Sequence, residues 1–179
     1  VMISAPTAEP GKRYPVLFVL DGNWYFRTAS DTNTWGSGRF EPAIVVGVGY
    51  PTEENSEVSR RRGIDMSVKE QGERYKGGCD IFLRIIEDEI KPFVASRYPV
   101  DPARYMLYGK SLGGLAVARA LLRTPENYST YLMISPALGQ GDKAVLADEP
   151  AFSAKARSGD LKLRILITSA GGEGYTGSD

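Results

Sequence analysis

Continuous apolar runs of strand length recur along the chain and alternate with longer helix-like segments. The runs predict strands over 1–5, 15–20, 43–48, 104–108, 131–135 and 161–168. Runs that are apolar on both faces are typical of a parallel sheet covered by helices on each side. Helices are predicted over 24–34, 79–97, 111–123 and 149–157. This alternation predicts an α/β fold with a mainly parallel sheet, and no linker divides residues 1–179 into two domains.

Three segments have a more specific pattern. Residues 79–97 place apolar side chains at three- and four-residue spacing, which predicts one buried face, and Pro92 predicts a kink. Residues 111–123 are apolar nearly all round, so this helix is expected to be buried. Residues 52–76 are polar and highly charged, and we interpret them as a long surface loop.

Composition removes several classes of function. Among 179 residues, 22 Lys and Arg balance 22 Asp and Glu, which argues against a general nucleic-acid or anionic-membrane binder. The single cysteine excludes a disulfide framework and a cysteine-based zinc site. The absence of histidine removes the commonest general base and metal ligand. No apolar stretch approaches the roughly 20 residues that span a bilayer, and the cellular compartment stays open.

The run Gly109-Lys110-Ser111-Leu112-Gly113 matches the pattern G-x-S-x-G. An apolar strand precedes it and an Ala- and Leu-rich helix follows, which is the setting of a nucleophile elbow. A serine in such a strained turn needs neighbours almost without side chains two positions before and after it, which Gly109 and Gly113 supply. Its hydroxyl would stand at a helix N-terminus, where backbone N–H groups can stabilise an oxyanion. The alternative is a glycine-rich turn in which Ser111 caps the helix.

Two nucleotide-binding patterns fail at single positions. The Gly-Lys-Ser part of the elbow resembles a phosphate loop, but the required earlier glycine is Arg104. Val46-Gly47-Val48-Gly49 begins a dinucleotide pattern, but its last glycine is replaced by Thr52.

Several further motifs accompany the elbow in a fixed order. They are Leu20-Asp21-Gly22 at a strand end, the strand at 42–50, Arg61-Arg62 with Asp65, Gly77-Gly78 followed by Phe82-Leu83, Gly114 after the elbow, and Ser135-Pro136. Together they resemble the esterase branch of the α/β-hydrolases, which contains enterochelin (ferric enterobactin) esterases, esterase-D-type S-formylglutathione hydrolases and mycolyltransferases. The enterochelin-esterase-like group is the most similar in character.

This resemblance implies an α/β-hydrolase fold and a serine carboxylesterase that works through an acyl-enzyme. Ser111 would be the nucleophile, and the backbone N–H groups of Leu112 and Asn23 would form the oxyanion hole. The family often has His or Gln where this chain has Lys110, which we expect to be solvated rather than to bias the field at the serine. No metal or other cofactor is implied.

The acid and the base of the triad should follow the serine in the order Asp or Glu, then His. Glu173, after the strand at 161–168, is the candidate acid by its resemblance to the family's G-G-x-E position, with Asp179 as second choice. A solvated loop carboxylate is the alternative for Glu173. No histidine follows. We favour a chain that is incomplete at both ends, lacking the first strand and the last strand and helix with the His loop. A non-catalytic relative, or Lys110 as the base, are the alternatives.

The partner expected is a small-molecule ester. Candidate substrate contacts are Trp24, Arg61, Arg62 and Lys110. Residues 60–62 are all arginine and would suit an anionic substrate such as a ferric catecholate siderophore, although a solvated basic loop balanced by Glu53, Glu54 and Glu57 is at least as plausible. Two other functions stay open: a non-catalytic binding protein on the same fold, and an acyltransferase that also uses Ser111. Cys79 is expected to be a buried structural thiol.

Overall fold

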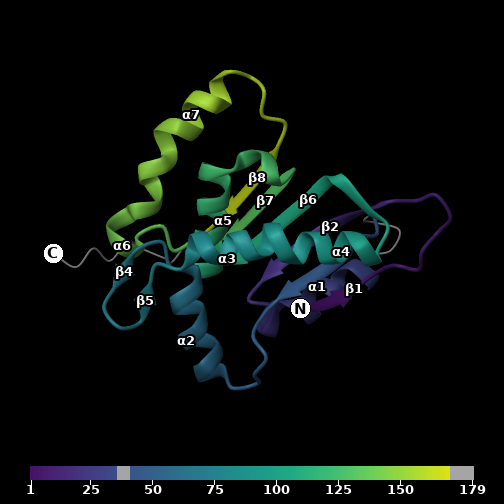
Figure 1. The fold of residues 1–179 in the computed structure, drawn as a ribbon, viewed down its shortest axis with the longest axis horizontal. Coiled ribbons are helices and arrows are strands. Elements are labelled where there is room, and N and C mark those ends of the chain that lie inside the picture. The colour runs from purple at the N-terminus through teal and green to yellow at the C-terminus, as the bar shows by residue number, and fades with distance from the viewer. Residues whose placement is uncertain (36–40, 170–179) are drawn as a thin grey trace.

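The computed structural model describes residues 1–35 and 41–169, and these form an α/β fold (Figure 1). The elements, in chain order, are β1 (Met2–Ser4), β2 (Tyr14–Leu20), α1 (Gly22–Trp35), β3 (Ile44–Val48), α2 (Asn55–Met66), β4 (Glu70–Gln71), β5 (Tyr75–Lys76), α3 (Cys79–Ile85), the π-helical segment η1 (Ile86–Ile90), α4 (Lys91–Arg97), β6 (Val100–Lys110), α5 (Leu112–Arg123), the 3-10 helix η2 (Pro125–Asn127), β7 (Thr130–Ile134), α6 (Gln140–Lys143), the 3-10 helix η3 (Ala144–Asp148), α7 (Glu149–Arg157) and β8 (Arg164–Thr168).

The central sheet is mainly parallel, as the sequence predicts. Its strand order is β1-β3-β2-β6-β7-β8, and only β1 pairs antiparallel with its neighbour. The central strands β2 and β3 are buried at nearly every position, which explains why they are continuous apolar runs rather than alternating ones. Separately, β4 and β5 form a short antiparallel hairpin.

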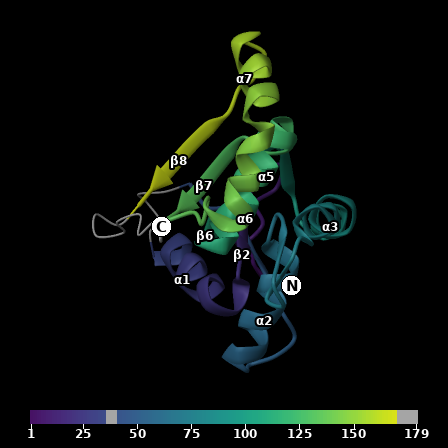
Figure 2. The same ribbon diagram turned by 90° about the vertical axis from the view of Figure 1, so that its left-hand side faces the viewer.

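Helices cover both faces of this sheet. Helix α1 packs against β2 and β3, and α5 packs against β6 and β7. Figure 2 shows α1 on one side of the sheet and α3 and α5 on the other. Ten of the twelve residues of α5 are buried, which confirms the prediction of a buried helix. None of the helices in the described parts of the chain has the length and apolar character needed to cross a membrane.

The prediction of a long surface loop over residues 52–76 is wrong. This segment contains α2 and the β4–β5 hairpin. Helix α2 buries only Val58, Gly63 and Met66, so its sequence carries no broad apolar stripe that would announce a helix. Its close packing depends on Gly63, because a Cβ there would lie 2.5 Å from the carbonyl oxygen of Arg74.

The predicted helix over residues 79–97 is present, with its irregularity in an unexpected form. Helices α3 and α4 are joined without a gap by the π-helical segment η1, which ends two residues before Pro92. Proline has no N–H to continue the hydrogen-bond ladder, and π turns are one of the usual ways in which a helix absorbs such a defect.

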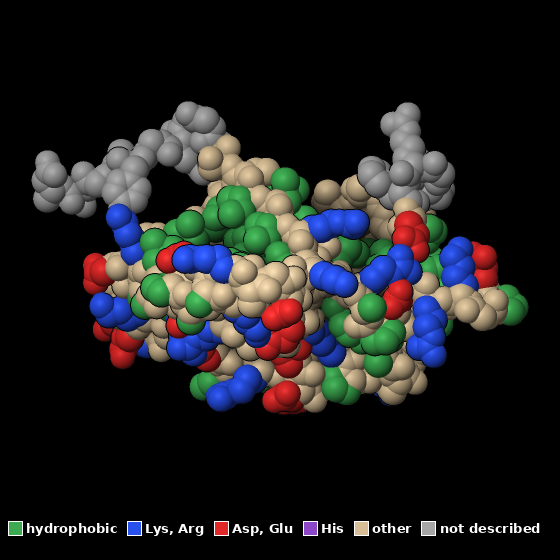
Figure 3. Space-filling view, turned by 90° about the horizontal axis from the view of Figure 1, so that it is seen from above, with side chains coloured by type: hydrophobic (Ala, Val, Ile, Leu, Met, Phe, Trp, Pro, Cys, Tyr) green, Lys and Arg blue, Asp and Glu red, His purple; other side chains and the backbone are tan. Residues whose placement is uncertain are grey.

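Strand β8 forms one edge of the sheet and is exposed along its whole length. Its apolar side chains Ile165, Leu166 and Ile167 are 43%, 50% and 57% exposed. Figure 3 shows a broad group of hydrophobic side chains (green) at the surface along the upper part of this view. The sheet therefore leaves part of its apolar surface uncovered by the described residues.

Candidate active site

Ser111 occupies a sharp turn between β6 and α5. Its backbone angles are φ 55° and ψ −116°, in a region that residues with a Cβ rarely adopt. The turn is tight because an added Cβ on Gly109 would lie 2.2 Å from the carbonyl oxygen of Gly113. Strained serine, preceding strand and following helix together have the geometry of a nucleophile elbow.

The Ser111 side chain is exposed and makes no capping hydrogen bond to α5. This argues against the alternative in which Ser111 is only a helix cap. The backbone of the elbow is held from the end of β7: Ser111 N–H donates to the Ile134 carbonyl at 2.9 Å. Gly114 packs so closely that a Cβ there would lie 3.0 Å from the Pro136 Cα atom. The hydroxyl is thus presented on a fixed backbone.

Asn23 and Leu112, the predicted oxyanion donors, both lie in the first turns of helices. Backbone N–H groups in a first turn have no acceptor within the helix. Helices α1 and α5 start at the same end of the sheet, at the carboxyl ends of its parallel strands. This is because the preceding strands β2 and β6 are parallel neighbours with Val19 opposite Tyr108. The structure therefore brings the two predicted donors to the end of the sheet at which Ser111 lies.

The Asn23 side chain fixes the neighbouring loop. Its amide nitrogen donates to the carbonyl oxygens of Tyr50 at 2.9 Å and Thr52 at 3.0 Å, and its amide oxygen accepts the Tyr50 N–H at 2.7 Å. Sequence reasoning assigned only a main-chain role to Asn23 and missed this one. An asparagine directly after a strand-ending Asp-Gly pair was the available signal.

An ion pair between Asp21 and Arg62 lies beneath these segments. The Asp21 side chain is fully buried, and Arg62 donates to both of its oxygens, Nε to Oδ1 at 2.9 Å and Nη2 to Oδ2 at 2.8 Å. The Arg62 guanidinium also lies 5.2 Å from the centroid of the Trp24 ring. Trp24 in turn donates from Nε1 to Asn55 Oδ1 at 2.8 Å. Sequence reasoning did not identify this pair, although a buried aspartate always calls for a cation or several donors.

The other predicted substrate contacts are more exposed. Arg61 is 43% exposed and pairs with Glu57 at 2.6 Å, on its own helix α2. Lys110 is exposed, and its ammonium nitrogen is 5.9 Å from the centroid of the Tyr25 ring. The structure thus gathers Trp24, Arg62 and the Lys110 backbone, while the Arg61 guanidinium is held by Glu57.

Two partly buried phenols near the site are held in their neutral form. Burial raises the pKa of Tyr50 well above its usual value, and the Asp65 carboxylate adds to that shift. Burial also raises the pKa of Tyr108, with smaller contributions from Tyr25 and Asp21. Neither phenol is available as a proton acceptor at neutral pH.

The acid of the triad is not placed by the structure, since Glu173 and Asp179 lie outside the described residues. Within residues 1–35 and 41–169, no group of His, Cys, Asp and Glu side chains is arranged to hold a metal ion.

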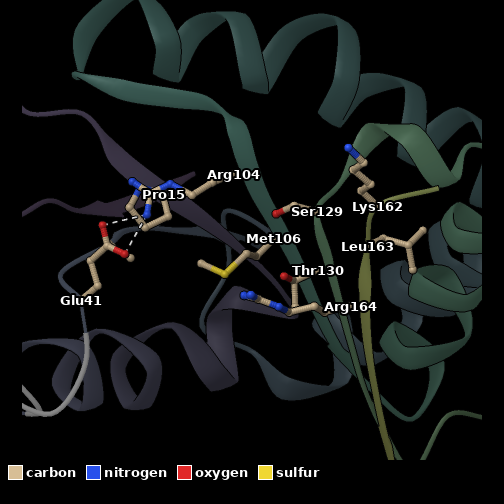
Figure 4. A pocket seen from close by; sticks show the side chains of 10 residues that line it. Pro15, Glu41, Arg104, Met106, Ser129, Thr130, Lys162, Leu163 and Arg164 are labelled. Atoms are coloured by element: carbon tan, nitrogen blue, oxygen red, sulfur yellow. Dashed lines mark hydrogen bonds and ion pairs between the residues drawn. The ribbon is translucent and has the colours of Figure 1, made fainter. Parts of the chain in front are cut away.

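Two hollows adjoin the sheet without including Ser111. The larger, of about 810 Å³, lies where β2, β7 and β8 begin and is lined by Arg104, Arg164 and Lys162 among others (Figure 4). It therefore lies at the amino-terminal ends of these strands, whereas Ser111 lies at the carboxyl end of β6. A smaller apolar hollow of about 480 Å³ lies between α1 and the sheet, lined by Tyr25, Tyr108 and Leu132 among others.

Comparison with known families agrees with this geometry. The family model described as "Putative esterase" matches residues 1–176. The chain belongs to this esterase family. Its fold is that of the α/β-hydrolases, as expected from the sequence motifs.

Individual members of the esterase family are similar over most of this chain. The ferri-bacillibactin esterase BesA of Bacillus subtilis is 31% identical over 184 residues, covering 94% of this chain and 64% of that protein. The siderophore triacetylfusarinine C esterase of Aspergillus fumigatus is 33% identical over 144 residues, covering 77% of this chain and 49% of that protein. A crystal structure of the BES protein from Bacillus cereus superposes with a TM-score of 0.85 at 30% identity, covering 93% of this chain and 66% of that one. The chain thus spans about half to two thirds of the length of these relatives.

Proposed function

We propose that the protein is a serine carboxylesterase and that Ser111 is its nucleophile. The observation that carries the proposal is the strained, exposed Ser111, which lies at the start of the buried helix α5 and whose side chain makes no capping hydrogen bond to that helix. Backbone strain of this kind costs about 1–3 kcal/mol and persists where function requires it. Membership of the esterase family supports the same role.

In the proposed reaction the Ser111 hydroxyl attacks the ester carbonyl carbon and passes its proton to a base. The carbonyl oxygen becomes an oxyanion, which the N–H groups of Leu112 and Asn23 stabilise. Collapse of this intermediate breaks the bond to the alcohol, which leaves with the proton from the base. Water then attacks the acyl-enzyme in the same way and releases the acid. Fixed donors aimed at the oxyanion are commonly worth about 100- to 1000-fold in rate each.

No histidine, the usual proton acceptor of the triad, occurs among the 179 residues. We assign the base to a histidine outside residues 1–179 and the acid to Glu173. Lys110 is the alternative base within the chain. The variant Lys110→Met separates the two, since only a Lys110 base would make it as inactive as Ser111→Ala.

The substrate class we propose is the siderophore ester. Its support is the pair of relatives named for ferri-bacillibactin and triacetylfusarinine C. Trp24, at the helix start after β2, and Lys110, beside Ser111, would contact such a substrate, together with Arg61 if its guanidinium exchanges Glu57 for the substrate. The two cations suit an anionic ester by their charge.

A fluorophosphonate probe tests the enzyme claim on the full gene product that contains residues 1–179. We expect one covalent label, which peptide mass spectrometry places on Ser111 and which Ser111→Ala abolishes. Absence of the label would favour a non-catalytic binding protein. Hydrolysis of a catecholate trilactone faster than of a simple aryl ester supports the substrate class. Ester exchange to an added alcohol, in preference to hydrolysis, would instead indicate an acyltransferase.

A further inference from the structure

We propose that Arg62 is a positioning residue, which holds the two halves of the oxyanion hole in register through the buried carboxylate of Asp21. This inference rests on the proposed function, because the two halves are the helix starts that carry the Asn23 and Leu112 donors. Arg62 itself comes from α2, far from both in the sequence.

Asp21 contacts both helix starts at once. On the α1 side, its carbonyl oxygen accepts the N–H groups of Trp24 at 2.9 Å and Tyr25 at 3.2 Å. On the α5 side, its carboxylate lies against Gly113, where an added Cβ would be 3.1 Å from Asp21 Oδ2. Gly113 follows Leu112 directly, so a movement of the Asp21 carboxylate changes the spacing between the two donors.

Asp21 makes this contact with an unfavourable backbone conformation and a fully buried charge. Asp21 has a positive φ of 53°, although it is not a glycine, and its side chain has no exposure to water. A buried carboxylate with a strained backbone is costly unless it is fully paired. Arg62 supplies that pairing, since its side chain is 13% exposed and both carboxylate oxygens are engaged.

An arginine is required at this position for geometric reasons. Its planar fork binds two carboxylate oxygens together and fixes their plane, whereas a lysine offers a single point charge. The Trp24 ring 5.2 Å away restricts the guanidinium further. Nη2 also lies 3.5 Å from the carbonyl oxygen of Lys110, the residue before the nucleophile. The ion pair between Asp21 and Arg62 therefore links the junction of β2 and α1 to α2 and to the elbow.

The experiment compares Arg62→Lys with Arg60→Lys in the full gene product. Arg60 is the matched control, because it also binds a carboxylate with two donors from α2, but at the surface on Glu57. With a small neutral aryl ester, we expect Arg62→Lys to lower kcat about 10- to 100-fold and to change KM less than about threefold. The reason is that misplaced donors stabilise the transition state less well, while binding of the substrate in its ground state changes little. Arg60→Lys should leave both parameters within about twofold of wild type.

A second measurement does not depend on activity. Hydrogen exchange of peptides covering residues 21–27 and 109–116 should accelerate together in Arg62→Lys, with the β7 peptide unchanged. If Arg62→Lys does not fold, the neutral pair Asp21→Asn with Arg62→Gln replaces it in both assays.

Three results decide the matter. A raised KM with unchanged kcat would show that Arg62 touches substrate and would overturn the positioning role. Wild-type exchange in both helix starts would also overturn it. A wild-type protein that neither hydrolyses esters nor takes the fluorophosphonate label would refute the proposed function, while the exchange data still decide whether Arg62 holds the two helix starts together.

Discussion

The backbone N–H of Ala137 donates a hydrogen bond of 3.0 Å to the carbonyl oxygen of Ser111. Ser135, two residues earlier, also has a positive φ, of 42°, and donates its N–H to the Thr168 carbonyl at 2.7 Å. The ends of β6, β7 and β8 are therefore tied to one another by backbone bonds. The nucleophile elbow is held by its neighbours as well as by its own turn.

Substitution of the elbow glycine tests how tight that turn is. Gly109→Ala places a Cβ 2.2 Å from a backbone oxygen that cannot move away without moving α5. We expect the free energy of unfolding to fall by about 3 kcal/mol or more. That is the upper end of the usual cost of an overpacked site, which is about 1–3 kcal/mol. The control is Gly139→Ala, where no atom lies within 4 Å of the new Cβ and φ is −76°. Urea unfolding should place the control within about 0.5 kcal/mol of wild type.

The strain at Ser111 predicts opposite effects on stability and chemistry. Ser111→Gly removes the Cβ from a backbone with φ 55°, whereas Ser111→Ala keeps it. We expect the glycine variant to be more stable than the alanine variant by about 1 kcal/mol, in contrast to the usual cost of glycine. Both should lose fluorophosphonate labelling. A glycine variant less stable than the alanine variant would show that the turn is unstrained.

An ion-pair network on α5 predicts a stability that depends on pH. The Arg119 side chain, 9% exposed, pairs with Asp80 and with Asp148, and its hydrogen bond lowers the pKa of Asp80. Arg119→Met should cost about 2 kcal/mol, less than for a fully buried pair because both carboxylates are partly exposed. A carboxylate with a lowered folded-state pKa stabilises above its unfolded pKa and loses that effect as the pH falls. The wild type should have a higher midpoint temperature of thermal unfolding than the variant at neutral pH, and this difference in Tm should shrink below pH about 4.

The neighbouring Arg123 provides the comparison for that measurement. It contacts the same two aspartates but is 48% exposed. Arg123→Met should therefore cost no more than about 1 kcal/mol. Equal losses for the two variants would contradict the role of burial.

The single cysteine should be inert in the folded protein. Cys79 is 1% exposed, and burial raises the pKa of its thiol to about 12. The thiolate is the reactive form, so at pH about 8 we expect Ellman's reagent to react at least about 100-fold more slowly with the native protein than in concentrated guanidinium. Rapid reaction of the native protein would place Cys79 at the surface.

The fold could be predicted from sequence where one local property dominates. Doubly buried strands are long apolar runs, and the buried α5 is apolar all round, so both were identified with nearly correct bounds. Helix α2 could not, because its burial rests on Gly63 meeting a backbone oxygen of another segment. A close approach between backbones leaves no hydrophobic signal at either position.

The same division applies to the site. Ser111 and the proposed Leu112 donor belong to one local motif, the run from Gly109 to Gly113, whereas Asn23 was predicted from the resemblance to the esterase family. The pairing of Asp21 with Arg62 joins residues that are 41 positions apart, and nothing in the arginine run distinguishes Arg62 from its neighbours. Only the fold shows that Arg60 and Arg61 bind Glu57 while Arg62 points to the interior.

The strand order has a consequence for folding kinetics. Strand β2 lies between β3 and β6, and its Val16 pairs with Tyr105, about 90 residues later in the chain, a loop whose closure carries a substantial entropy cost. The elbow follows β6 directly, yet Gly113 must meet Asp21 at the end of β2. The serine can therefore acquire its strained conformation only after this slow, non-local pairing, so we expect the site to mature with the sheet and not from a preformed local turn.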